Sequence, residues 1–99
     1  MRRIVWEPLA VHPVKEEAEL RPSSVVQPTT VLFDNRTSSD VSLFWIDSKG
    51  QRKSYGFVRA GQKQVRPTFT THAWVVVNSD GKVLGIYVAG TGAGKVVIQ

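Results

Sequence analysis

From residue 29 onward, hydrophobic residues come in short runs that are separated by polar or glycine-containing segments. The runs are rich in β-branched and aromatic residues, which fit a pleated strand. No window has an apolar period of 3.6 residues that is long enough for a helix. The pattern therefore predicts a series of short β-strands, at residues 30–33, 41–46, 51–58, 62–66, 73–77, 82–88 and 95–98.

Two of the segments between the runs have the composition of hairpin turns. Residues 47–50 read Asp-Ser-Lys-Gly, and residues 78–81 read Asn-Ser-Asp-Gly. Glycine adopts a positive φ without the steric cost that a side chain meets there. We therefore expect Gly50 and Gly81 to have positive φ, and a substitution by valine at either position to destabilise the fold.

Short strands at this spacing predict an all-β fold, a β-sandwich of about seven to eight short, mostly antiparallel strands. A length of 99 residues suits one domain. Residues 1–22 differ from the rest, because they contain three prolines and a charged stretch at 15–19. Proline favours extended and turn conformations over helix. We expect residues 1–19 to form an N-terminal arm or an extra strand, with Trp6 in the strand or packed on the domain.

The formal net charge is +5, with 13 basic and 8 acidic residues spread along the chain. Such a spread is typical of a solvated surface, and a more specific interpretation of the charge is that the protein binds an acidic partner. Because no nucleic-acid-binding motif accompanies the charge, we expect no nucleic-acid partner.

Cysteine is absent, so no disulfide can form. This fits a reducing compartment and predicts a cytoplasmic location. No apolar run approaches the roughly 18 residues of a membrane-spanning helix. The basic residues at the start are not followed by the apolar segment of a signal peptide. We therefore expect no contact with a membrane.

Two segments resemble known motifs, and for each of them another interpretation is better. Residues 90–95, Gly-Thr-Gly-Ala-Gly-Lys, suggest a phosphate-binding loop. That motif needs a glycine where Ala89 stands, a serine or threonine where Val96 stands, and a following helix. Residues 35–37, Asn-Arg-Thr, match an N-glycosylation acceptor, but a turn asparagine that bonds nearby backbone is the better interpretation.

Support for catalysis is thin. The chain has two histidines, His12 and His72, and no cysteine. No nucleophile with an adjacent base can be identified from spacing, and a metal site would need more ligands. We therefore predict a protein that is not an enzyme and that holds no metal and no cofactor.

Residues 68–74, Thr-Phe-Thr-Thr-His-Ala-Trp, form the most informative segment. Residues two apart on a strand share a face, so His72 and Trp74 would point the same way if this segment is extended. With Trp45 and Tyr55, three aromatic rings, a hydroxyl and an imidazole would line one pocket for a small ring. The alternative interpretation is that both tryptophans are core residues and that His72 is a surface histidine.

An ordered set of residues runs at fixed spacing, without a gap, from Leu20 to Trp74. It comprises Leu20-Arg21, Pro28, residues 31–37 (Val-Leu-Phe-Asp-Asn-Arg-Thr), Trp45, Asp47, Gly50, Tyr55, Gly61 and His72-Ala73-Trp74. The set resembles the β domain of the von Hippel–Lindau tumour suppressor family. The resemblance is looser over residues 78–99.

The resemblance implies a β-sandwich over residues 20–99 that captures 4-hydroxyproline in a peptide, which in that family comes from the hypoxia-inducible factor α subunit. Trp45 and Trp74 would form walls around the pyrrolidine ring. Tyr55 would line the pocket and reach the peptide backbone. Thr68, where the family has serine, and His72 would form hydrogen bonds with the 4-hydroxyl group.

The chain also departs from the family. Pro67 replaces a histidine that contacts the peptide, Phe69 replaces a tyrosine, and the residues near Ser24 and Val26 differ. These changes leave open which peptide is bound. The family's helical α domain, which docks the elongin adaptor of a ubiquitin ligase, has no counterpart after Val88, so we expect no such adaptor as a partner.

The sequence therefore supports three functions of different classes. The first is a binding module for a hydroxyproline-containing, or related prolyl, peptide. The second is a structural or protein-interaction domain that uses another face of the same scaffold. The third is a carbohydrate-binding module in which exposed aromatic rings stack on sugars.

Overall fold

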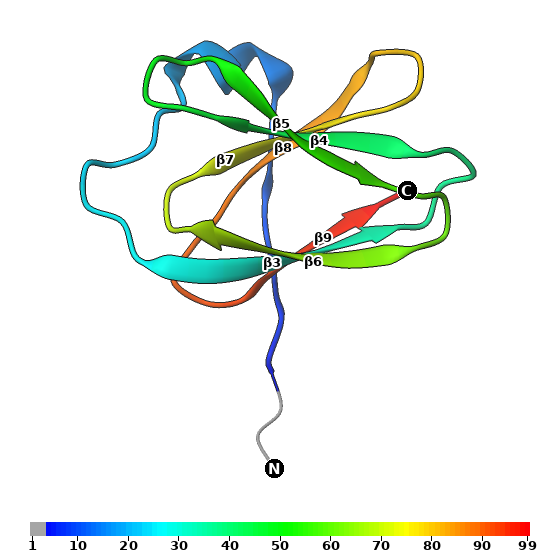
Figure 1. Cartoon of the computed structure of the whole chain (residues 1–99), viewed down its shortest axis with the longest axis horizontal. Helices are drawn as coiled ribbons and strands as arrows, with labels where there is room; N and C mark the ends of the chain where they lie inside the picture. Colours follow the sequence, from blue (N-terminus) through cyan, green and yellow to red (C-terminus); the bar gives the residue numbers. More distant parts are fainter. Residues whose placement is uncertain (1–3) are drawn as a thin grey trace.

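A computed structural model of the chain describes residues 4–99, and residues 1–3 of the predicted N-terminal arm lie outside the described part. The described residues confirm the all-β class and the sandwich architecture (Figure 1). They form nine strands and one 3-10 helix: β1 Glu7–Pro8, β2 Val11–His12, η1 Val14–Glu19, β3 Pro28–Asn35, β4 Val41–Ile46, β5 Arg52–Val58, β6 Lys63–Phe69, β7 Ala73–Val77, β8 Val83–Val88 and β9 Gly94–Ile98.

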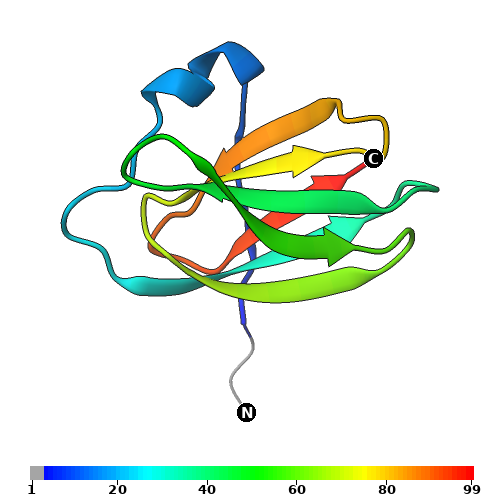
Figure 2. The same ribbon diagram turned by 45° about the horizontal axis from the view of Figure 1, so that its top comes forward.

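The strands make two sheets that face each other. The first sheet has the order β1-β9-β3-β6, and the second has the order β2-β8-β7-β4-β5. All pairs in the second sheet and the β3–β6 pair are antiparallel, whereas β9 runs parallel to both β1 and β3. Strands β5 and β6 are the last strands of their sheets, and residues 59–62 join them at one edge of the sandwich (Figure 2).

The main core lies between the two sheets. Alternate residues of each strand point into it, as the two-residue period of a strand requires. Its buried members come from both sheets: Val31, Phe33, Val41, Leu43, Val58, Trp74, Val76, Ala89, Val96 and Ile98.

A second apolar cluster covers the outer face of the five-stranded sheet. It contains Ile46, Ala73, Val75, Val77 and Ile86, and Leu20 packs against it. Strand β7 is consequently buried at all five positions. A strand covered on both faces has a continuous apolar run, and this is why residues 73–77 show no alternation of polar residues.

The expectation that the N-terminal segment has no helix is wrong, because Val14–Glu19 form η1. Backbone bonds of the 3-10 type run from Glu16 N to Pro13 O and from Leu20 N to Glu17 O. A six-residue helix of this kind is too short to produce a detectable apolar period.

The N-terminal segment closes one edge of the sandwich. Its two short strands join different sheets, β1 beside β9 and β2 beside β8, so residues 7–12 cross from one sheet to the other (Figures 1 and 2). Leu9, between these strands, packs against the main core. It fills the space beside Gly94, where an added Cβ would lie 2.8 Å from the Leu9 side chain.

Both predicted turn glycines have positive φ, +79° at Gly50 and +83° at Gly81, which confirms the expectation. Each turn is held in the same way by the side chain of its first residue. Asp47 Oδ1 accepts bonds from the backbone N–H groups of residues 49 and 51. Asn78 Oδ1 accepts bonds from those of residues 80 and 82.

Strand β6 extends to Phe69, three residues beyond the predicted end at residue 66. The extension includes Pro67, although proline cannot donate to a ladder. Since β6 is the last strand of its sheet, it tolerates a proline there. This extension brings Thr68 to the open edge of the sandwich. Among residues 4–99, no helix is long and apolar enough to cross a membrane.

Candidate functional site

All five residues predicted to line a site surround one cavity of about 170 Å³. Four of them come from strands of both sheets, and His72 comes from the turn between β6 and β7. The lining residues are Trp45, Tyr55, Thr68, His72 and Trp74, together with Pro67 and Phe69. The cavity opens at the edge of the sandwich formed by β5 and β6, opposite the edge that the N-terminal segment closes.

A β-bulge on β5 positions Tyr55. Ser42 pairs with Phe57 and Phe44 pairs with Ser54, so two residues of β5, Tyr55 and Gly56, face one residue of β4. Gly56 has a φ of +84°, as glycine-containing bulges require. The extra residue shifts the alternation, so that both Tyr55 and Val58 face inward. Unbroken alternation would instead give Tyr55 and Phe57 the same face.

Trp74 is both a core residue and a wall of the cavity, so the two sequence interpretations of this residue are compatible. It is 2% exposed. Its ring packs on Phe33 at 5.3 Å and meets the Tyr55 ring edge-on, with centroids 5.2 Å apart at 86°. Its indole Nε1 donates a hydrogen bond of 3.1 Å to Thr68 Oγ1.

Thr68 is the buried polar residue of the site, with 6% of its surface exposed. Its oxygen already accepts the bond from Trp74. Among residues 4–99 the hydroxyl donates no hydrogen bond to another protein group. A hydroxyl carries one proton and two acceptor lone pairs, so Thr68 keeps a proton to donate to a ligand.

His72 lies against two aromatic rings. It stacks on Trp45 with the ring centroids 5.1 Å apart and an angle of 11°, and Phe69 lies at 5.5 Å. Burial lowers the pKa of His72 below its ordinary value of 6.5, so the ring is neutral near pH 7. A neutral imidazole has one nitrogen that donates and one that accepts.

Strand β7 begins at Ala73, as predicted, so His72 lies in the preceding turn and not on one extended strand with Trp74. The His72 backbone is nevertheless fixed. Its N–H bonds to Phe69 O at 3.2 Å, and its carbonyl accepts a bond of 2.9 Å from Ala89 N. The turn therefore brings the imidazole to the same cavity as the Trp74 ring.

Thr71 gives this turn an unusual backbone, which the sequence did not reveal. Its φ is +68°, a left-handed conformation that is rare for a β-branched residue. Side-chain bonds hold the turn in place: Thr71 Oγ1 accepts from Ser23 N at 2.8 Å, and Thr70 Oγ1 accepts from Gln27 N at 3.0 Å. The segment before β3 thus helps to hold the residues next to His72.

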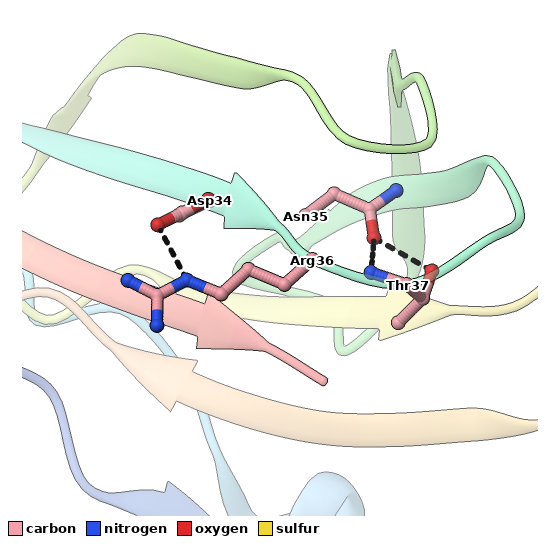
Figure 3. A network of polar contacts seen from close by, with 4 residues as sticks. All are labelled: Asp34, Asn35, Arg36 and Thr37. Carbon is pink, nitrogen blue, oxygen red and sulfur yellow. Dashed lines mark hydrogen bonds and ion pairs between the residues drawn. The ribbon is translucent and has the colours of Figure 1, made fainter.

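The polar residues at the end of β3 hold a turn through hydrogen bonds between their side chains and backbone (Figure 3). The buried Asn35 donates its amide hydrogens to Ser39 O and Val58 O, and its oxygen accepts from the N–H and the hydroxyl of Thr37. An amide nitrogen used in this way cannot carry a glycan without breaking the turn. Arg36 bonds to the Asp34 carboxylate at 3.0 Å beside it.

The glycine-rich segment at residues 90–95 lies in a setting that disfavours a phosphate. The Glu7 carboxylate lies so close to Gly92 that an added Cβ would be 2.9 Å from its Oε2 atom. A carboxylate there repels a phosphate, and strand β9 follows where a phosphate-binding loop needs a helix. In the described part of the chain, no three His, Asp or Glu side chains form a group that would hold a metal ion.

Comparison with known proteins identifies one family. The family model of the VHL beta domain matches residues 20–86, about two thirds of the chain. This range includes all five predicted lining residues, and it confirms the resemblance inferred from the sequence. It leaves out β1, β2, η1 and β9. No curated protein matches the chain.

Proposed function

The chain belongs to the VHL beta domain family, and from that premise we propose that it is a non-catalytic module for a peptide containing 4-hydroxyproline or a related prolyl residue. The family supports protein–protein interaction in general. The observation that carries the finer proposal is the meeting of three aromatic rings, one hydroxyl and one imidazole around a single cavity. The absence of cysteine supports a cytoplasmic location.

The rings of the site suit the apolar part of a proline. Trp45 and Trp74 would contact the pyrrolidine ring from two sides, and Tyr55 would lie at the entrance, where it is 39% exposed. Apolar walls with few polar groups are typical of small-ligand sites, in which the polar groups fix orientation. Here those groups are Thr68 and His72.

Thr68 and neutral His72 complement a ligand hydroxyl group. The Thr68 proton would be donated to the ligand oxygen, and the ligand hydroxyl would donate its own proton to the accepting nitrogen of His72. An unhydroxylated proline would leave both protein groups without a partner. Thr68 is the buried group of the two, and leaving such a group unpaired costs about 1–3 kcal/mol, so the site discriminates against the missing hydroxyl.

The peptide backbone would be extended beside β6. This strand is the last of its sheet and has one free side, which suits a segment in the polyproline or β conformation. Pro67 has no N–H to donate, so a bound strand would make a broken rather than a continuous ladder with β6.

Isothermal titration with two peptides that differ only in Pro or 4-hydroxyproline tests the proposal. We expect the hydroxylated peptide to bind at least about tenfold more tightly, which corresponds to the loss of one buried polar contact. Equal weak binding of both peptides, or no heat with either, would count against the proposal.

Two other functions make different predictions. If the chain is an interaction domain that uses another face, Trp45→Ala and His72→Ala would leave the capture of its partner unchanged. A carbohydrate-binding module needs open aromatic faces, but His72 covers one face of Trp45. We therefore expect no hits on a glycan array.

A further inference from the structure

Positive charge is concentrated on the strands beside the cavity. Between Asp47 and Asp80 the sequence contains no acidic residue, and β5 and β6 both lie within this stretch. The same stretch contains six basic residues: Lys49, Arg52, Lys53, Arg59, Lys63 and Arg66. The open edge of the sandwich is therefore basic, because its strands β5 and β6 carry no acidic residue that would neutralise the charge.

Acidic residues from elsewhere pair with only part of this charge. Glu17 on η1 makes a two-point ion pair with Arg52, with N–O distances of 2.6 and 2.8 Å, and the bond from Arg52 lowers the pKa of Glu17. Asp47 lies 3.7 Å from the Lys53 ammonium group. These two cations are thus partly neutralised within the protein.

Arg59 and Arg66 make no ion pair with any residue in the described range 4–99. Arg59 lies over the Phe57 ring at 5.8 Å, and Arg66 lies over the Tyr55 ring at 5.9 Å. The hydrogen bond that Arg66 makes through its side chain goes to the neutral Gln64, at 3.0 Å. A guanidinium group placed on an aromatic face keeps its edge free for a carboxylate.

Arg66 also lies in a shallow, open groove that adjoins the cavity. The groove runs between β5 and β6 and is lined by Ser54, Tyr55, Gly56, Val65, Arg66 and Pro67. It shares Tyr55 and Pro67 with the cavity. A peptide whose prolyl ring fills the cavity therefore has a path along which its neighbouring residues reach Arg66.

We propose that this groove binds acidic residues that flank the prolyl residue in the same peptide, with Arg66 as the residue that selects them. The proposal rests on the proposed function and adds a charge requirement to it. A planar guanidinium binds a carboxylate through two parallel N–H bonds, which gives geometric as well as electrostatic selection. A nucleic acid fits less well, because its binding requires several phosphate contacts and the groove offers one unpaired guanidinium.

The test compares peptides that differ only in charge next to the prolyl residue. Each peptide contains 4-hydroxyproline, flanked on one side by two aspartates or by two asparagines, and both sides are tried. Affinities are measured at low and high salt for the unmodified chain, for Arg66→Gln and for Arg59→Gln. Lys82→Gln is the control, since it removes the same charge from the exposed turn between β7 and β8.

We expect aspartate on one side to strengthen binding about threefold to tenfold at low salt, and less at high salt, as for exposed ion pairs. Arg66→Gln should abolish this advantage, so that it binds the aspartate and asparagine peptides equally, and Arg59→Gln should reduce the advantage. Lys82→Gln should preserve it. Melting temperatures confirm that each variant is folded.

Equal affinities for the aspartate and asparagine peptides would overturn the inference, and Arg66 would then serve only as an inward charge that keeps the edge strand from pairing. If Lys82→Gln and Arg66→Gln reduced the advantage of the aspartate peptide equally, the attraction would be unspecific and the inference would also be overturned. Binding of a short single-stranded oligonucleotide that is tighter than binding of the aspartate peptide would overturn it as well.

The same titrations separate this inference from the function on which it rests. A preference for hydroxyproline without a preference for aspartate would support the proposed role of the cavity and refute the proposed role of the groove. A preference for aspartate that Arg66→Gln removes, without a preference for hydroxyproline, would support the proposed role of the groove and refute that of the cavity. No binding of any peptide would refute both.

Discussion

The Thr68 hydroxyl group accepts a hydrogen bond within the protein and keeps its own proton for a ligand. The bond comes from the indole N–H of Trp74 to one lone pair of the Thr68 oxygen, and it fixes this oxygen at the cavity wall. Serine would keep this arrangement and lose only a methyl group. Valine would keep the shape of the side chain and lose both bonds.

We therefore expect Thr68→Val to lower the free energy of unfolding by about 1–3 kcal/mol, because the buried Trp74 N–H loses its acceptor, and to remove the preference for hydroxyproline. Thr68→Ser should cost roughly 0.8 kcal/mol, the value of one buried methyl group, and retain the preference. Urea unfolding and titration of both variants check this. A valine variant as stable and selective as the parent would contradict it.

His72 should make both stability and ligand selection depend on pH. Burial lowers the pKa of His72 in the folded chain below 6.5. As the pH falls below 6.5, the unfolded chain therefore binds more protons at this residue than the folded chain does. Stability therefore falls as the pH drops through this range. Protonated imidazole has no acceptor, so the preference for hydroxyproline should fall as well.

Unfolding and titration at about pH 7.5 and about pH 5 measure these two effects, since His titrates in this range. His72→Gln serves as the control, because it should lose this part of the pH dependence. A hydroxyproline affinity that is the same at both pH values would contradict the role of His72 as an acceptor.

At the scale of elements, the bulge in β5 decides what the cavity can hold. Gly56 lies at its centre with a positive φ and space around it: an added Cβ would meet only the end of the Arg66 side chain, at 3.9 Å. Its backbone conformation, rather than crowding, therefore requires glycine. Without the bulge, Tyr55 and Val58 would not both face inward, and the edge-on contact between Tyr55 and Trp74 would be lost.

Gly56→Ala should reduce the free energy of unfolding by roughly 1–2 kcal/mol, the cost of a left-handed backbone for a residue with a Cβ. It should also weaken binding of both peptides, since Tyr55 would shift. Gly90→Ala is the matched control, because Gly90 is exposed and has open space around it. Denaturation curves for both variants test this, and equal stabilities would be the contrary result.

The strands with long apolar runs could be predicted from the sequence, and β4 and β7 match their predicted bounds. The rings and polar groups of the site could be predicted because their order and spacing resemble one family. Two-residue strands such as β1 and β2 produce no periodic signal. The left-handed Thr71 was not predictable, because its conformation depends on a tertiary bond to Ser23 that no local pattern contains.

At the scale of the whole molecule, the two long edges of the sandwich differ. Residues 7–12 cross one edge and place Leu9 against the core. The other edge, between β5 and β6, is occupied by the cavity and the groove. The closed edge stabilises the pair of sheets, so the open edge can expose aromatic and basic side chains.

Leu9→Ala should therefore lower the free energy of unfolding by about 1–2 kcal/mol, less than the 2–5 kcal/mol of a fully buried leucine, without changing peptide affinity. Val11→Ala is the control on the same segment. Val11 is 60% exposed, so its truncation should change stability by less than about 0.5 kcal/mol. A loss of affinity in Leu9→Ala that exceeds the loss of folded protein would contradict the separation of the two edges.

The position of β9 determines when the molecule can assemble. This strand lies between β1 and β3, and its register joins Glu7 to Gly94. A nascent chain on the ribosome therefore lacks the middle of its first sheet until residues 94–98 have emerged from the exit tunnel. Pairings between such distant residues form slowly. Until then β3 has an unpaired edge, so β9 is the strand that protects this edge of the sheet from pairing with other chains.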